Sequence, residues 1–106
     1  MVGLAGRIDE SWASGQIDEE AVALAIDALD RGAARVAERT PGAEGPDAWV
    51  VNEWLKRAIL LYFRMMPMRH GSWGDYHWSD KIPLKTDLTG IRVVPPGSAR
   101  RPMVEP

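Results

Sequence analysis

No cysteine occurs in this chain, which excludes disulfides, thiolate metal ligands and a cysteine nucleophile. Long apolar runs are absent too, because Lys56, Arg57 and Arg64 interrupt the best candidate before it reaches the roughly 18 apolar residues that a membrane-spanning helix needs. The N-terminus carries no charged segment followed by an apolar core and a cleavage site. These absences predict a cytoplasmic protein with no membrane partner.

The chain also lacks an excess of charge of either sign. Its 13 basic and 15 acidic side chains give a formal net charge of -2, so no global field attracts nucleic acid. The glycine-flanked segment at residues 71–74 lacks the spacing and the strand-to-helix setting of a phosphate-binding loop. We therefore predict no nucleic-acid partner and no cofactor.

Residues 49–66 are the stretch around which the chain is organised, and they predict a short strand running into a buried helix. Asn52 is an N-cap residue whose side chain can accept a backbone hydrogen bond, and Pro67 prevents continuation of the helix. We expect Trp54 and Leu61 to lie deep in the core. The apolar positions recur at helical spacing: Trp54, Leu55, Ala58, Ile59, Leu61, Tyr62 and Phe63.

Two further helices are predicted before this segment. The first covers residues 2–14. The second is capped by Asp18 and ends at Gly32, which can adopt the left-handed conformation that often follows a helix.

The remaining segments predict strands and loops. Residues 33–39 alternate like a half-buried strand, and a loop over residues 40–47 joins them to a second strand at 49–51. Residues 67–81 show neither helical nor strand periodicity and predict a long aromatic loop, whereas residues 91–94 predict an edge strand.

These elements define a small α+β domain. It has two N-terminal helices, a short strand pair, a central buried helix and a C-terminal edge strand. We expect one domain over residues 1–106, with its core in 18–96 and an irregular tail over 97–106.

One block of sequence is more specific than these patterns. Residues 49–64 read Trp-Val-Val-Asn-Glu-Trp-Leu-Lys-Arg-Ala-Ile-Leu-Leu-Tyr-Phe-Arg, which resembles the signature of the N-terminal domain of tetrahydrodipicolinate N-succinyltransferase. Three other blocks resemble the same family in the same order: residues 34–38, 80–85 and 91–96. Together the four blocks cover most of residues 18–101.

The resemblance brings with it the known activity of the family's enzyme. The family's enzyme transfers a succinyl group from succinyl-CoA to ring-opened tetrahydrodipicolinate, in the lysine and diaminopimelate pathway, and acts as a trimer. Its acyltransferase machinery lies mainly on a left-handed β-helix that follows the Val-Val-Pro-Pro block, and residues 100–106 do not continue in that way. We therefore expect a free-standing relative of the N-terminal domain that cannot transfer succinyl groups alone. We also expect a homo-oligomer or an acyltransferase partner.

A ligand site is predicted between the aromatic loop and residues 81–92. A small anionic amino-acid-like molecule, such as an amino-dicarboxylate or a cyclic imine, would find cations and aromatic walls there. The alternatives are surface charges or structural ion pairs for the cations, and aromatics that only cover an apolar surface. The predicted ligand-binding residues are Arg64, Trp73, Tyr76, Trp78, Lys81, Lys85 and Arg92.

A second hypothesis makes the chain a repurposed small enzyme of amino-acid or specialised metabolism. His77, flanked by aromatic residues, is the best candidate for a general acid or base, and His70 and Asp75 are the other candidate catalytic residues. These three residues and Asp80 are metal-ligand types, but their spacing matches no standard site, so we predict no metal.

Overall fold

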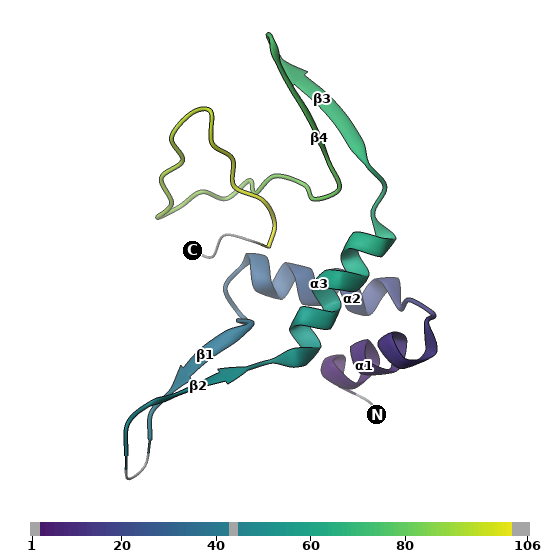
Figure 1. Cartoon of the computed structure of the whole chain (residues 1–106), viewed down its shortest axis with the longest axis vertical. Coiled ribbons are helices and arrows are strands. Elements are labelled where there is room, and N and C mark those ends of the chain that lie inside the picture. Colours follow the sequence, from purple (N-terminus) through teal and green to yellow (C-terminus); the bar gives the residue numbers. More distant parts are fainter. Residues whose placement is uncertain (1–2, 43–44, 103–106) are drawn as a thin grey trace.

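The computed structural model describes residues 3–42 and 45–102. Val2, part of loop 40–47 and the end of the tail therefore lie outside the described residues. The described residues form three helices and two small antiparallel strand pairs in one small domain, which confirms the α+β class (Figure 1). The elements are α1 (Leu4–Ser14), α2 (Glu19–Asp30), β1 (Ala37–Thr40), β2 (Ala48–Val51), α3 (Glu53–Met65), β3 (Arg69–Trp73) and β4 (Tyr76–Asp80).

Both ends of α2 follow the predicted local signals. The Asp18 side chain accepts a hydrogen bond from the Ala21 backbone N–H at 3.1 Å, which satisfies a first-turn donor. The same carboxylate pairs with Arg7 of α1 at 2.9 Å. Gly32 has φ +76°, the left-handed conformation that glycine adopts without a steric penalty. One cap residue thus also joins the first two helices.

The ends of α3 are confirmed as well, although Asn52 acts differently from the prediction. The helix ends at Met65, and Met66 is extended because Pro67 follows it. Asn52 occupies the N-cap position without a side-chain capping bond. Its Nδ2 instead donates to the backbone oxygen of Arg35 at 2.7 Å. The side chain therefore ties the start of α3 to the segment before β1.

The three helices pack around a single apolar core. Leu61 is completely buried, as expected, whereas Trp54 is only partly buried and packs at the edge of the core. The prediction of a deep Trp54 was wrong because the face of α3 that meets the other helices passes through Leu55, Ala58 and Leu61. The core residues are Ile8, Ala21, Val22, Ala25, Ile26, Leu29, Leu55, Ala58, Leu61, Tyr62 and Ile82.

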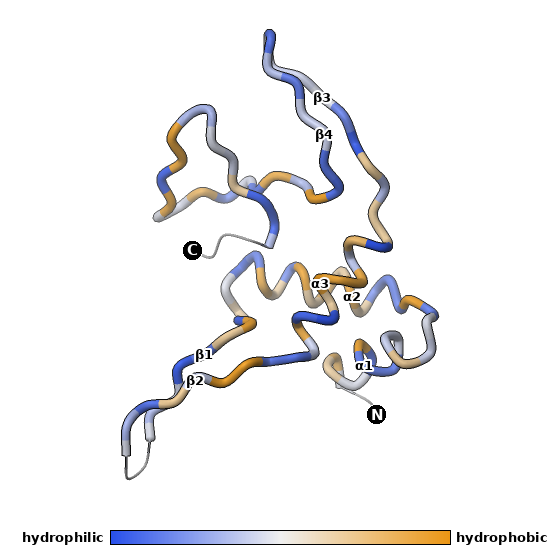
Figure 2. Tube along the Cα trace, in the orientation of Figure 1, coloured by the Kyte–Doolittle hydropathy of each residue, from blue (hydrophilic) through white to orange (hydrophobic). Residues whose placement is uncertain are grey.

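Strands β1 and β2 form an antiparallel ribbon, which we call the β1–β2 arm. The predicted pairing is confirmed, with Ala37 opposite Val51 and Arg39 opposite Trp49. The half-burial predicted for residues 33–39 is found only before the strand, where Ala34 and Val36 are partly buried against the core. Every residue of β1 and β2 is exposed. Figure 2 shows the apolar β2 segment on this arm, away from the helices.

Residues 67–81 are not the irregular loop that the sequence predicted. They contain β3 and β4, which form the β3–β4 hairpin around a turn at Gly74 and Asp75. Gly74 has φ +58°, while no non-glycine residue of the described chain has a positive φ, a pattern that suits a type II′ turn. The predicted edge strand at 91–94 is also wrong, since no strand is formed there.

The two hairpins extend away from the helical core and give the chain an expanded shape (Figure 1). The molecule measures 54 × 36 × 17 Å, with a radius of gyration of 16.2 Å. A compact domain of this length has a radius of gyration of about 13 Å. Among the described residues, no helix has the length and apolar character needed to cross a membrane.

Candidate ligand cleft on the β3–β4 hairpin

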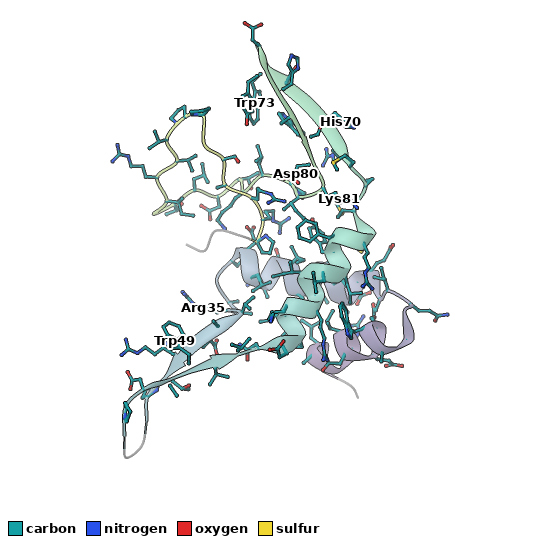
Figure 3. All side chains as sticks on the ribbon, viewed as in Figure 1. Arg35, Trp49, His70, Trp73, Asp80 and Lys81 are labelled. Atoms are coloured by element: carbon teal, nitrogen blue, oxygen red, sulfur yellow. The ribbon has the colours of Figure 1, made fainter. Side chains whose placement is uncertain are left out.

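The strand register divides the side chains of the β3–β4 hairpin between two faces. Successive side chains along a strand point to opposite sides, and directly opposed residues share a side. Figure 3 shows Trp73 on the side toward the C-terminal segment and His70 on the other side. The aromatic face carries the pairs Arg69–Asp80, Gly71–Trp78 and Trp73–Tyr76, and the polar face carries the pairs His70–Ser79 and Ser72–His77.

The aromatic face borders a cleft of about 350 Å³. Trp73 and Tyr76 stack with their ring centroids 5.7 Å apart and their planes 8° from parallel, and Trp78 lies 6.2 Å from Trp73. Residues 82–84 and 98–100 contribute to the opposite wall. A volume of this size lies at the lower end of the range of small-molecule sites, which is roughly 300–1,000 Å³.

The wall opposite the hairpin is held by hydrogen bonds between two chain segments. Leu84 and Arg100 form an antiparallel bridge, and the Lys85 N–H donates to the Ala99 oxygen at 2.8 Å. Arg100 also pairs with Asp80 of the hairpin, with Nη2 3.0 Å from Oδ1. This ion pair connects the two walls of the cleft.

A buried ion-pair cluster ties the same C-terminal segment to α2. The Lys85 ammonium donates to the Asp30 backbone oxygen and lies 2.9 Å from its Oδ1, and Arg101 Nε lies 2.9 Å from its Oδ2. Burial alone would raise the pKa of Asp30, but the hydrogen bonds from Lys85 and Arg101 outweigh it and lower that pKa. The Lys85 side chain is only 2% exposed and its ammonium pairs with Asp30, so this cation has a structural role.

The structure brings together only part of the predicted ligand site. Trp73, Tyr76 and Trp78 all line the cleft. The four predicted cations do not line it. Lys85 pairs with Asp30, Lys81 Nζ donates to the Phe63 oxygen at 2.9 Å, and Arg64 lies over the Trp12 ring at 5.0 Å.

Arg92 is the fourth predicted cation and lies on the exposed segment after Gly90. Over residues 3–42 and 45–102 its side chain has no ion pair or hydrogen bond. The cations that do line the cleft are Arg69 and Arg100, which the sequence analysis did not select. The Gly74–Asp75 turn was the signal that could have identified Arg69, because it implies the hairpin on which Arg69 opposes Asp80.

The candidate catalytic residues lie away from the cleft. His70 and His77 belong to the polar face, where His70 Nδ1 lies 2.6 Å from Ser79 Oγ, and Asp75 is in the exposed turn. Within the described parts of the chain, no group of three histidine or acidic side chains is placed to hold a metal ion. The aromatic wall and the histidines therefore belong to two different surfaces.

Comparison with known families matches residues 4–65 to the family described as Tetrahydrodipicolinate N-succinyltransferase N-terminal. The chain belongs to this family. Among curated relatives, the 2,3,4,5-tetrahydropyridine-2,6-dicarboxylate N-succinyltransferase of Alkalilimnicola ehrlichii is 48% identical over 90 residues, covering 77% of this chain and 31% of the relative. The enzymes of the same name from Aeromonas hydrophila and Burkholderia mallei are 41% and 44% identical and cover 87% and 89% of this chain.

The tetrahydrodipicolinate N-succinyltransferase N-terminal family accounts for the helical core and the β1–β2 arm. The chain spans about a third of the length of the curated relatives it matches, 31% to 39% in these three cases. The family match ends at residue 65, so the β3–β4 hairpin and its cleft lie beyond it.

Proposed function

We propose that this chain is a docking module that packs onto the acyltransferase domain of a succinyltransferase of its own family. The observation that carries the proposal is the exposure of apolar side chains on a projecting arm. Trp49 is 70% exposed, and Val50 and Val51 are 44% and 49% exposed. Large exposed apolar side chains gathered on one projecting element are typical of protein interaction sites.

The β1–β2 arm has the form expected of an interface element. Trp49, Val51 and Ala37 share one face of the ribbon, since Ala37 opposes Val51 and Trp49 lies two residues before Val51. Tryptophan is enriched at the energetic centres of interfaces because it buries a large area. The acyltransferase domain is the proposed partner because the relatives, named as N-succinyltransferases, extend well beyond the third that this chain matches.

Association with the acyltransferase domain of a relative tests this proposal. We expect sedimentation velocity to show a complex, and Trp49→Ala to weaken it by about tenfold or more, as a buried interface tryptophan does. Leu24→Ala is the matched control, since Leu24 is a large apolar residue that is 48% exposed on α2, away from the arm. Absence of a complex, or equal effects of the two substitutions, would contradict docking through the arm. A complex of the chain only with itself would assign the arm to self-association.

We also propose ligand binding by Arg92 as a second candidate function. Its support is that Arg92 is exposed and has no side-chain partner in the described parts of the chain, whereas the other three predicted cations are engaged. The relatives are named for a dicarboxylate, and a guanidinium can pair with a carboxylate through two parallel hydrogen bonds. The proposed ligand is an amino-dicarboxylate or a cyclic imine that carries carboxylates.

Calorimetric titration with tetrahydropyridine-2,6-dicarboxylate measures this second function. We expect Arg92→Ala to weaken binding by about tenfold or more, because it removes a charge-assisted hydrogen bond. Arg39→Ala is the control, since Arg39 is an exposed arginine that pairs with Asp47 on the β1–β2 arm. Equal affinity of wild type and the Arg92 variant would rule out this role.

The enzyme hypothesis has less support than either proposal. Acid–base chemistry requires the catalytic group within hydrogen-bond reach of a bound substrate. His70 and His77 lie on the polar face of the hairpin, while the cleft lies on the aromatic face. The geometry therefore favours docking and ligand binding over catalysis by the histidines.

A further inference from the structure

One buried N–H group of a residue that lines the cleft has no acceptor among the described residues. It is Trp78 Nε1. Arg100 is held by Asp80 at two points, with Nε 2.7 Å from Oδ2 and Nη2 3.0 Å from Oδ1. Buried polar groups are nearly always hydrogen-bonded, and an exception requires an explanation. Trp78 Nε1 is such an exception, and since it is a donor the missing group is an acceptor.

The charged residues of the cleft favour an anion. Arg69 and Arg100 carry two positive charges and Asp80 carries one negative charge, so the lining has a net charge of +1. Asp80 is paired with Arg100. Within the described residues, Arg69 takes part in no side-chain ion pair or hydrogen bond. One carboxylate would balance this charge and accept hydrogen bonds from Arg69 and Trp78 Nε1.

The aromatic wall favours a flat molecule. The Trp73 and Tyr76 rings stack with their planes within 8° of parallel, and both line the cleft, so a flat ring can pack against this stack. Trp78 sits directly over Gly71, whose missing side chain leaves the room that the indole occupies. A Cβ at that position would collide with Trp78 ring atoms. Gly71 therefore sets the position of the Trp78 indole, and an aromatic side chain laid across a glycine is a known means of stabilising strand pairs.

We infer that the cleft between the aromatic face of the β3–β4 hairpin and residues 82–84 and 98–100 binds a small monocarboxylate with a flat, unsaturated ring. The ring packs against the Trp73–Tyr76 stack, and the carboxylate pairs with Arg69 and accepts a hydrogen bond from Trp78 Nε1. This site is separate from the Arg92 site and from the β1–β2 arm, so it does not depend on either proposed function.

Benzoate is the probe, and benzamide is the matched neutral compound of the same ring size. In a two-dimensional NMR titration of the full chain, we expect benzoate to shift the Trp78 indole N–H signal, which Trp78→Phe identifies by its loss. We expect benzamide to bind at least tenfold more weakly, because it lacks the charge that Arg69 complements. Equal binding of the two compounds, or a Trp78 signal that benzoate leaves in place, would overturn the inference.

Variants measured by calorimetry separate this site from the others. Trp78→Phe keeps an aromatic ring but removes the donor, and we expect benzoate affinity to fall about tenfold, the equivalent of about 1.4 kcal/mol. Trp49→Phe and Arg92→Gln are controls that should leave benzoate binding unchanged. Gly71→Ala, which displaces the indole, should weaken binding while the NMR signals of α3 show that the core is intact. Unchanged affinity in Trp78→Phe would refute the assigned hydrogen bond, and loss of binding in Arg92→Gln would move the site to Arg92.

Discussion

Leu61→Ala is expected to lower the free energy of unfolding by about 2 to 5 kcal/mol. Leu61 is completely buried on the face of α3 that packs against the other helices. Truncation removes buried methyl groups and leaves a cavity that the surrounding helices fill only in part. Urea denaturation followed by circular dichroism measures the change, since the three helices that form the core give the helical signal that is lost on unfolding.

Leu60→Ala is the matched control for this experiment. Leu60 is the adjacent residue on the same helix, but its side chain is 48% exposed. The two substitutions change helix propensity equally, so the difference between them isolates burial. A loss below about 1 kcal/mol for Leu61→Ala, or equal losses for the two variants, would contradict the position of α3 in the core.

Lys85→Ala is expected to destabilise the chain by about 3 kcal/mol, because it removes one partner of a buried ion pair and leaves Asp30 with less compensation. Asp30 is only 16% exposed, and Arg101 remains as its second partner, which places the expected loss at the lower end of the range for such pairs. Thermal and urea unfolding measure the loss. Lys56→Ala is the control, since Lys56 pairs with Glu53 at the surface of α3 and should contribute less than about 1 kcal/mol.

Acid titration gives a second measurement of the same cluster. The pKa of Asp30 is lower in the folded chain, so its ionised form stabilises the fold above the pKa of the unfolded state. This stabilisation is lost as the pH falls through the lowered pKa. We expect Lys85→Ala to reduce the acid dependence of stability. Identical acid profiles for wild type and Lys85→Ala would show that Lys85 does not stabilise the Asp30 carboxylate.

Local signals explain why the helix boundaries could be predicted from the sequence. Asp18, Gly32 and Pro67 act through the backbone of their immediate neighbours, so their effects do not depend on the rest of the fold. Asn52 marked the correct boundary for a different reason. Its side chain bonds to Arg35, 17 residues away, and no local pattern encodes that contact.

The β3–β4 hairpin was missed because its apolar alternation is weak. Gly71 occupies a position on the aromatic face where alternation would place a large side chain, and Trp78 on the opposite strand fills that space. The periodicity appears only when both strands are considered together. The two-residue turn at Gly74 and Asp75 was the local signal for a hairpin.

The candidate site was only partly predictable because charge partners depend on tertiary structure. The aromatic residues at 73, 76 and 78 were identified from their concentration in one segment, and all of them line the cleft. Lys85 reaches Asp30 across 55 residues of sequence, and Arg100 meets Asp80 across 20. Such pairs follow from the packing of the C-terminal segment on α2 and on the hairpin.

The alternation of faces on the β3–β4 hairpin limits how its length can change during evolution. A strand repeats its orientation every two residues, so one residue inserted within β3 would turn the following side chains to the opposite side. Trp73 would then face away from the cleft, while Ser72 would take its place beside Tyr76. Two inserted residues would instead restore the original orientation. Homologues that keep the cleft should therefore differ in the length of these strands by even numbers of residues.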